Sequence, residues 1–405
     1  MNTHYQPGQH VFFDGAAGSD KICATATTAL SGHLVGIYTS IRSSSYTSVY
    51  GKVITATGAM PPSFLVPEVT DNYQKDADIA PIEGTDDFAV VWTSNATGKY
   101  LVYIRLFRVT ANGKVVPVSL SQQLTENNGD YMAPRVVYLS EQKVYLVLWV
   151  SVTTREIQFK YVSYDETSDT FNDETYTTVL DDTVASDYFT SALDISNNAS
   201  LSLCLINVAT RVVAAIKRSA SEIGLYEFTS PLAGKILQYK LPVYSVANIS
   251  KFDICFDTDG YIKIVYVQTG TSQVYGDNIP YFDVKHLSQV AGEPVQLNQL
   301  NHGCGRPVIV AERFIAPPAL SADATPVSYH VSWETASYGC FYNKFTADFI
   351  ATGGEEYINS SDSSSDSPRL GVTDNQVAVL FNATKNGTVT LAGSEGILID
   401  VYDIS

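Results

Sequence analysis

The stretch DADIAPIEGTDDFAVVWTSNATGKYLVYIRLFRVTANG, from Asp76 to Gly113, decides the fold. It contains short runs of β-branched and aromatic residues separated by segments rich in Gly, Asp and Asn, which is the pattern of strands joined by turns. Elsewhere the chain shows no long apolar repeat of 3.6 residues with helix-capping residues. The pattern therefore predicts an all-β fold.

Variants of this stretch recur along the 405 residues. The second strand of each unit ends on a large apolar residue, and these marker residues are spaced by about 57 residues. The markers are Tyr38, Trp92, Trp149, Ile206, Tyr266, Trp333 and Phe381. A cation marks the third strand of six units, at Lys52, Arg105, Lys160, Lys217, Lys285 and Lys344. Two markers in phase predict a seven-bladed β-propeller with four-stranded antiparallel blades.

We expect one propeller domain that occupies residues 1–405, because no break in composition marks a linker. The blades are expected at 15–70, 76–123, 133–179, 189–230, 250–299, 305–358 and 367–405. The innermost strand should come first in each blade, as at Asp78–Ile82, Pro134–Leu139, Phe252–Phe256 and Pro307–Val310. The last unit ends after its third strand, and a spare strand candidate lies at Gln9–Asp14. We therefore expect the N-terminal segment to supply the outer strand of blade seven and to remove a sheet edge.

Composition excludes several classes of protein. The net charge is −17, which disfavours a nucleic-acid partner because binding a phosphate backbone needs a cationic surface. Apolar residues make up 45% of the chain, which argues against disorder. No apolar run is long enough to insert into a membrane. The N-terminus lacks the basic and apolar regions of a signal peptide, so we expect a cytoplasmic protein or one exported by another route.

The sequence carries no familiar catalytic or metal-binding motif, so no catalytic residue, metal or cofactor is predicted. The five cysteines are widely spread and lack CxxC spacing, which favours reduced residues in the core. The densest reactive cluster is the loop Asn301–Arg306, which contains His302 and Cys304. No second histidine lies near it in sequence.

Candidate ligand residues lie in the loops that join blades, because in a propeller these loops share one face with the loops between second and third strands. They are Tyr73, Asp130, Tyr131, Asp187 and Tyr188. The Asp130–Tyr131 pair and the Asp187–Tyr188 pair are 57 residues apart, so they should occupy equivalent places in adjacent blades. A tyrosine ring beside a carboxylate suits a sugar, because the ring stacks on its C–H face and the carboxylate accepts from its hydroxyls. The alternative is structural: Asp caps the backbone and Tyr covers a blade edge.

Arginines recur where inner strands begin, at Arg135, Arg306 and Arg369. Guanidiniums near one mouth of the central channel suit a carboxylate, sulfate or phosphate. The competing explanation is charge balance with Asp78, Asp130 and Asp366. For the marker tryptophans we expect packing between blades, and for the third-strand cations a pairing with carboxylates of neighbouring blades.

The marker strands resemble the loosely conserved propeller repeats of bacteria, of the form P-x-V-x-x-L…G-x-φ-φ-V-x-W-x-S. The nearest copies are AVVWTSNATG and PRVVYLSEQKVYLVLWVS. In size the chain also resembles seven-bladed lectins of fungi and bacteria, but it lacks the DxDxDG calcium loops of one lectin type and the S-x-D-x-G-x-x-W box of sialidases. The resemblance implies a propeller fold, and no site residue is carried over from it.

Three functions remain open from the sequence. The first is a multivalent carbohydrate-binding protein that recognises glycans through its loop face. The second is a polysaccharide lyase or glycoside hydrolase, with His302, Arg306 and a loop tyrosine at the channel mouth. The third is a scaffold that binds a protein partner on the same face.

Overall fold

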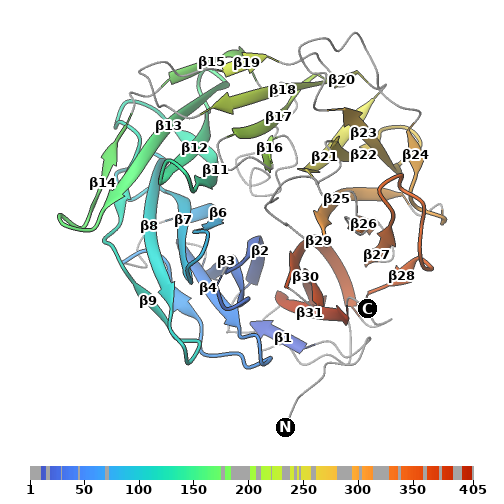
Figure 1. Ribbon diagram of the computed structural model, residues 1–405, viewed down its shortest axis with the longest axis horizontal. Coiled ribbons are helices and arrows are strands. Elements are labelled where there is room, and N and C mark those ends of the chain that lie inside the picture. Colours follow the sequence, from blue (N-terminus) through green and yellow to red (C-terminus); the bar gives the residue numbers. More distant parts are fainter. Residues whose placement is uncertain are drawn as a thin grey trace.

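The computed structural model describes an all-β protein (Figure 1). It describes the whole chain except residues 1–10, 15–18, 29, 44–45, 69–72, 175–177, 184–200, 207–210, 220, 230–237, 241–243, 246–247, 257–260, 281–293, 301–302, 313–327, 336–338, 359–362, 374–375, 386–394 and 404–405. Among the residues described, no helix has the length and apolar character that crossing a membrane requires.

The strands form antiparallel blades around a central axis, as the repeat predicts (Figure 1). The first strands of the blades are β2 (Ser19–Thr27), β6 (Gln74–Pro81), β11 (Tyr131–Leu139), β16 (Leu201–Ile206), β21 (Ile249–Phe256), β25 (Cys304–Ala311) and β29 (Ser363–Val372). The second strands are β3 (Leu34–Ser43), β7 (Asp87–Ser94), β12 (Val144–Ser151), β17 (Arg211–Ser219), β22 (Tyr261–Gln268), β26 (Tyr329–Thr335) and β30 (Gln376–Lys385).

The third strands are β4 (Tyr46–Ile54), β8 (Leu101–Val109), β13 (Glu156–Asp165), β18 (Glu222–Thr229), β23 (Gln273–Pro280), β27 (Gly339–Phe345) and β31 (Glu395–Asp403). The outer strands are β5 (Phe64–Leu65), β9 (Val115–Pro117), β10 (Gln122–Gln123), β14 (Thr170–Asp173), β15 (Thr178–Thr183), β19 (Gln238–Lys240), β20 (Tyr244–Ser245), β24 (Val295–Gln296) and β28 (Glu356–Tyr357). In three blades the outer strand is split into two short pieces that both pair with the third strand.

Within the described residues the strands form six hydrogen-bonded sheets, one of which has eight strands. That sheet contains two four-stranded units, β2 to β5 and β29 to β31 with β1 (Val11–Asp14), which a single parallel pair, Ser19 with Glu395, joins. Counting these units separately gives seven blades, and we number them in chain order from blade one (β2) to blade seven (β29).

The N-terminal strand closes the last blade, as predicted. Strand β1 pairs antiparallel with β31, and Val11 lies opposite Ile399. Figure 1 shows β1 beside β31 at the outer side of blade seven. This pairing covers the outer edge of β31. Without it, the unpaired backbone N–H and C=O groups of that edge could pair with a strand of another chain.

The hydrophobic core lies between neighbouring blades. Trp92, Trp149 and Trp333 are each at most 1% exposed, which confirms that these markers pack in the core. The cluster around Trp92 combines apolar residues of blades one and two, and the cluster around Trp149 combines those of blades two and three. Each blade therefore buries both of its faces against its neighbours.

Arg105 pairs with a carboxylate of the neighbouring blade, as we expected of the third-strand cations, whereas the ion pairs of Lys160 and Lys344 lie within their own blades. Arg105 donates from Nη1 to the carbonyl oxygen of Val66, at 2.9 Å, and pairs with Glu68, both in the preceding blade. Lys160 donates to the carbonyl oxygen of Leu124 across the same kind of junction, at 3.0 Å. These contacts tie the outer parts of adjacent blades together.

The first strands begin earlier than the sequence pattern indicated. Strand β6 starts at Gln74 instead of Asp78, and β25 at Cys304 instead of Pro307. The reason is a β-bulge, which puts an extra residue between paired positions and breaks the alternation that the prediction used. Equivalent bulges occur in β11 and β29.

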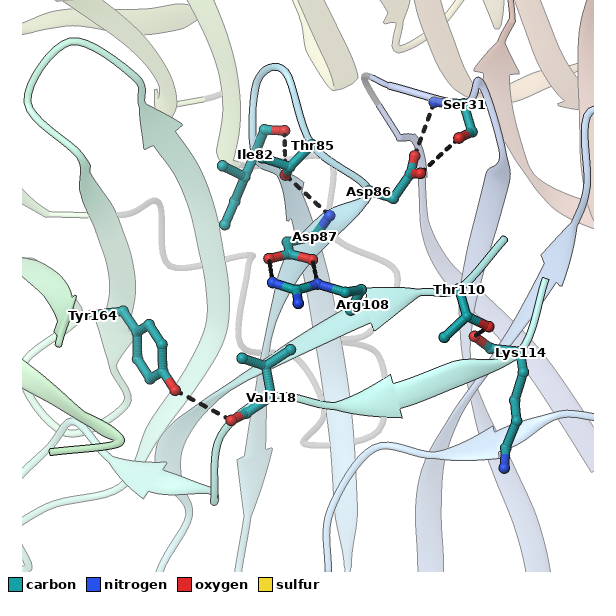
Figure 2. A network of polar contacts seen from close by, with 10 residues as sticks. All are labelled: Ser31, Ile82, Thr85, Asp86, Asp87, Arg108, Thr110, Lys114, Val118 and Tyr164. Atoms are coloured by element: carbon teal, nitrogen blue, oxygen red, sulfur yellow. Dashed lines mark hydrogen bonds and ion pairs between the residues drawn. The ribbon is translucent and has the colours of Figure 1, made fainter. Parts of the chain in front are cut away.

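Polar contacts connect blades on the face opposite to the bulges (Figure 2). Asp86 accepts two hydrogen bonds from Ser31 of blade one, at 2.9 Å from the amide and 2.6 Å from the hydroxyl. Next to it, Arg108 forms a two-point ion pair with Asp87. The Tyr164 hydroxyl donates to the carbonyl oxygen of Val118 in the preceding blade. On this face, these hydrogen bonds and the ion pair connect neighbouring strands and blades.

Candidate ligand-binding site

Asp130 and Tyr131 serve the fold in the way that the structural alternative describes. The Tyr131 side chain is 7% exposed, and its hydroxyl donates to Asn128 Oδ1 at 2.5 Å. Asp130 Oδ1 accepts from the Tyr100 amide at 2.8 Å, and its carbonyl oxygen accepts from Val152. The burial of the Tyr131 ring argues against the exposed stacking surface that we expected there.

Tyr73 occupies the place of Asp130 in the preceding blade. Its carbonyl oxygen accepts from the Asn95 amide at 3.0 Å, as that of Asp130 accepts from Val152. The Tyr73 amide also donates to Asn95 Oδ1, at 2.7 Å. Unlike Tyr131, the Tyr73 side chain is partly exposed, so it stays a candidate for contact with a ligand.

Other predicted residues are separated from this junction or lie outside the described residues. Asp187, Tyr188 and His302 belong to the second group. Arg306 is 2% exposed, and its amide donates to Glu334 Oε1 at 3.2 Å, so its side chain is part of the interior. The enzyme hypothesis that combined His302 with Arg306 and a loop tyrosine therefore gains no assembled group of side chains within the described residues.

Asp76 is the most unusual residue near the loop face. It lies in the bulge of β6, has a φ of 53° and is 3% exposed. Within the described part of the chain, neither carboxylate oxygen reaches a hydrogen-bond partner. Buried carboxylates are normally paired, because losing water without a partner costs free energy. An unsatisfied acceptor of this kind points to a ligand or an ordered water.

The pKa of Asp76 reflects this environment. Burial raises the pKa above its usual range, while the charges of Lys75 and Arg135 and the Ala133 amide oppose the rise without cancelling it. The Ala133 amide acts on the carboxylate although it lacks the geometry of a hydrogen bond. The folded protein thus disfavours the charged form of Asp76 even with two cations nearby.

Two tyrosines and a second carboxylate belong to the same junction between blades as Asp76. Burial raises the pKa of Tyr100, and the charges of Asp76, Tyr73 and Asp130 raise it further. The Lys75 ammonium lies over the Tyr100 ring, 4.8 Å from its centre. We call Tyr73, Asp76, Tyr100 and Asp130 the junction site, because they come from blades two and three where these blades meet.

Charged residues lie on the first strands of four blades, and these strands surround the central axis (Figure 1). They are Asp78, Arg135, Asp253 and Arg369. Burial raises the pKa of Asp78 despite the opposing charges of Arg135 and Arg369.

Glu334 connects blades five, six and seven. Its carboxylate accepts from the amides of Arg306 and Ser367, at 3.2 and 2.9 Å, and lies 3.5 Å from the Lys251 ammonium. Although burial acts in the opposite direction, Lys251, Arg306 and the two amides hold the pKa of Glu334 below its usual range. A Cβ on Gly305 would lie 2.5 Å from Glu334 Oε1, so the glycine makes room for the carboxylate. With its oxygens occupied, Glu334 acts as a structural link.

The described residues include neither a cluster of metal ligands nor an activated thiol at Cys304. There, no three His, Cys, Asp or Glu residues are grouped closely enough to hold a metal ion. Burial raises the pKa of the Cys304 thiol to about 12, which keeps it protonated and unreactive at neutral pH.

The sequence named Tyr73 and Asp130 but missed Asp76 and Tyr100 as site residues. Asp76 reads as a polar residue that introduces a strand, and nothing in its sequence neighbours shows that it is buried. Tyr100 reads as a turn residue before β8. A usable signal was that Asp76 precedes an alternating strand, Asp78–Ile82, by only two residues. A bulge at that distance buries a residue that alternation alone would place in solvent.

No protein-family model and no curated protein matches this chain. Several solved structures are similar in fold. They include the sialidase of Trypanosoma rangeli in complex with 2,3-difluorosialic acid (TM-score 0.47, 9% identity, 98% of this chain and 57% of that chain). Others are AofleA from Arthrobotrys oligospora (0.49, 10%, 87% and 94%) and the endosialidase of phage phi92 (0.48, 8%, 98% and 69%).

The present chain spans 57% of the Trypanosoma rangeli sialidase and 66% of the Hadza microbial sialidase Hz136. At identities of 8 to 10% the likeness concerns the fold alone. What the protein does must therefore be argued from its own residues.

Proposed function

We propose that this protein binds a carbohydrate at the junction site of blades two and three. The observation that supports the proposal most directly is Asp76, a carboxylate that is 3% exposed and has no hydrogen-bond partner among the described residues. A sugar supplies what is missing, because two adjacent hydroxyls can donate to the two oxygens of one carboxylate.

The neighbours of Asp76 fit the same ligand. The hydroxyls of Tyr73 and Tyr100 can donate to and accept from sugar hydroxyls. Lys75 over the Tyr100 ring fixes the orientation of that ring, which reduces the entropy lost on binding. Asp130 is already held by the Tyr100 amide, so the backbone of blade two positions its carboxylate.

The arrangement around Asp76 occurs once among the bulges that the structure describes. The equivalent positions in blades three, six and seven are Ala133, Gly305 and Ser367. None of these side chains can supply a carboxylate. We therefore propose one site of this type for these blades, in place of the repeated sites expected from the sequence; whether other loops bind glycans stays a prediction.

The test combines a broad glycan array with titration calorimetry on the best hit. Asp76→Asn should weaken binding about tenfold or more, since a hydrogen bond to a charged group contributes about 1.5–3 kcal/mol. Tyr100→Phe should weaken it about fivefold through the loss of one neutral hydrogen bond.

Two matched variants serve as controls. Asp277→Asn removes another carboxylate that is 3% exposed, in blade five. Tyr261→Phe alters another tyrosine with a lysine over its ring, at 5.1 Å. Both should bind like the wild type. A folded wild-type protein that binds no glycan on the array, or controls that lose as much affinity as the junction variants, would refute the proposal.

A further inference from the structure

Blade six presents polar side chains to blade seven. On β26, Tyr329, Val331 and Trp333 pack in one cluster with residues of blade five. Successive side chains of a strand point to opposite faces, so His330 and Ser332 face blade seven. The equivalent faces of β7 and β12 carry apolar side chains that pack against the next blade. Polar residues therefore set the junction of blades six and seven apart from these two junctions.

His330 is 2% exposed, so its imidazole is largely removed from water. Nδ1 shares a hydrogen bond with the Tyr342 hydroxyl at 2.6 Å, and the two rings are nearly parallel, with centres 5.8 Å apart. Among the residues that the structure describes, Nε2 reaches no hydrogen-bond partner. A neutral imidazole has one N–H, whereas a protonated imidazole has an N–H on both nitrogens. Protonation would therefore bury a charge together with an unsatisfied donor, which costs free energy.

Tyr342 connects His330 to the last blade. Its ring stacks on that of Tyr402, with centres 4.3 Å apart and an angle of 19° between the planes. Tyr342 also packs in one cluster with Leu370 and Val377 of blade seven. Tyr402 belongs to β31, the strand that β1 covers when the ring of blades closes. The hydrogen bond from His330 thus positions a ring that joins blade six to the closing blade.

The charges around His330 do not offset a proton on its ring. Lys344 lies directly opposite on β27, and its ammonium is 3.3 Å from the carboxylate of Glu312, which follows β25. Glu312 is therefore engaged with Lys344, and its carboxylate does not reach Nε2. From blade seven, β29 contributes apolar side chains such as Leu370, and β31 contributes the Tyr402 ring.

The titration of both partners agrees with this geometry. Burial lowers the pKa of His330 to about 4, while the charge of Glu312 opposes the shift and that of Lys344 adds to it. Burial raises the pKa of Tyr342, and the charges of Glu356 and Glu312 raise it further, so its hydroxyl stays neutral. The folded protein holds a neutral imidazole, whereas the unfolded chain binds the proton more readily.

We propose that His330 is a pH-sensitive switch at the junction of blades six and seven. The neutral imidazole positions the Tyr342 ring against Tyr402. In acid, the protonated imidazole is stabilised only where water reaches it, so blade seven separates from blade six. The switch lies outside the junction site of blades two and three, and it stands independently of sugar binding there.

The first test compares the wild type with His330→Asn by scanning calorimetry from pH 7 to pH 5. Asn can still form a hydrogen bond with Tyr342 but has no proton to gain in this range. As the pH falls below 6.5, the wild type should lose stability relative to the variant, because only its unfolded chain binds the proton. The relative loss should be about 20-fold in the unfolding equilibrium constant, or about 2 °C in melting temperature.

Hydrogen exchange read by mass spectrometry locates the change. In the wild type, peptides of β26 and β31 should lose protection at pH 5 relative to pH 7, after correction for intrinsic rates, while peptides of β7 and β12 keep theirs. His330→Asn should abolish this loss. The control is His33→Asn, which replaces a histidine of blade one that is 7% exposed and accepts from the Ala56 amide at 3.1 Å. This control should lose protection as the wild type does.

Nuclear magnetic resonance of the wild type with labelled histidines keeps the proposal testable if His330→Asn folds poorly. One imidazole, identified by its contacts with the Tyr342 ring, should stay neutral at pH 5. Titration of all six histidines near their ordinary pKa would overturn the proposal. So would an acid-induced loss of protection that is spread evenly over all blades, or one that is equal in His330→Asn.

Discussion

Replacing Asp76 by Asn should stabilise the folded protein at neutral pH while it weakens ligand binding. Asn fits the backbone, because the φ of 53° at this position is one that Asp and Asn tolerate better than most residues. The change removes a charge that is 3% exposed and lacks a hydrogen-bond partner among the described residues. Ligand-binding sites often retain residues of this kind, which lower the stability of the folded protein.

The expected gain in the free energy of unfolding equals the cost of leaving a buried polar group without a hydrogen-bond partner, about 1–3 kcal/mol. The raised pKa of Asp76 already includes the attraction of Lys75 and Arg135, so removing the charge gains stability even though two cations lose it as a neighbour. At about 2.1 cal/mol/K per residue, 405 residues have an unfolding entropy of about 0.85 kcal/mol/K. The melting temperature should therefore rise by about 1 to 4 °C.

The direction of the pKa shift predicts how the stability difference between wild type and Asp76→Asn changes with pH. The Asp76 pKa is raised on folding, so the folded state holds its proton more tightly than the unfolded chain. Wild type and Asp76→Asn should differ least below the unfolded pKa, near 3.8, where the carboxyl is protonated in both states. As the pH rises through the folded pKa, the wild type should lose stability relative to the variant.

Scanning calorimetry of both proteins from pH 3.5 to pH 8 checks this prediction, with Asp277→Asn as the control. A difference between wild type and Asp76→Asn that does not change with pH would refute the reasoning, as would a variant that is less stable at pH 7. Either result would mean that Asp76 is satisfied in the free protein.

Three further predictions concern the fold. Trp149→Ala should destabilise the protein by about 3–5 kcal/mol in urea unfolding, because the side chain is fully buried between blades two and three; a loss below 1 kcal/mol would contradict this packing. Deleting residues 1–14 should lower the melting temperature, because β1 then no longer covers β31, and an unchanged value would disprove the closure. Glu334→Gln should remove stability that the wild type has above the unfolded pKa of about 4.5 and loses as the pH falls, so the two proteins should converge in acid; a constant gap would exclude this role.

The repeat made the fold predictable from the sequence. Trp92 and Arg105 recur in phase with their counterparts in other blades, and both have the structural roles that the pattern indicated. The starts of the first strands were wrong because a bulge leaves no reliable mark in a sequence. The same bulge explains why Asp76 was missed, since it places a polar residue in the interior within two residues of a regular strand.

The candidate ligand residues were predicted only in part. Tyr73 and Asp130 belong to the junction site, whereas Tyr131 is buried and Arg306 is enclosed beside Glu334. Sequence spacing showed which residues occupy equivalent places in different blades. It did not show which of them face solvent, because equivalent positions in neighbouring blades have different surroundings.

The sequence by itself determined the all-β class, the period of the repeat and the residues that pack between blades, because these depend on local alternation and on spacing along the chain. The tertiary structure alone decided which charges are satisfied. Arg135 and Arg369 are far apart in the chain, yet the propeller places both on first strands, which surround the central axis (Figure 1). Whether Asp76 has a partner likewise depends on the neighbouring blade, which supplies Ala133 and Arg135. Pairing of this kind is a property of the closed ring of blades, and no single repeat contains it.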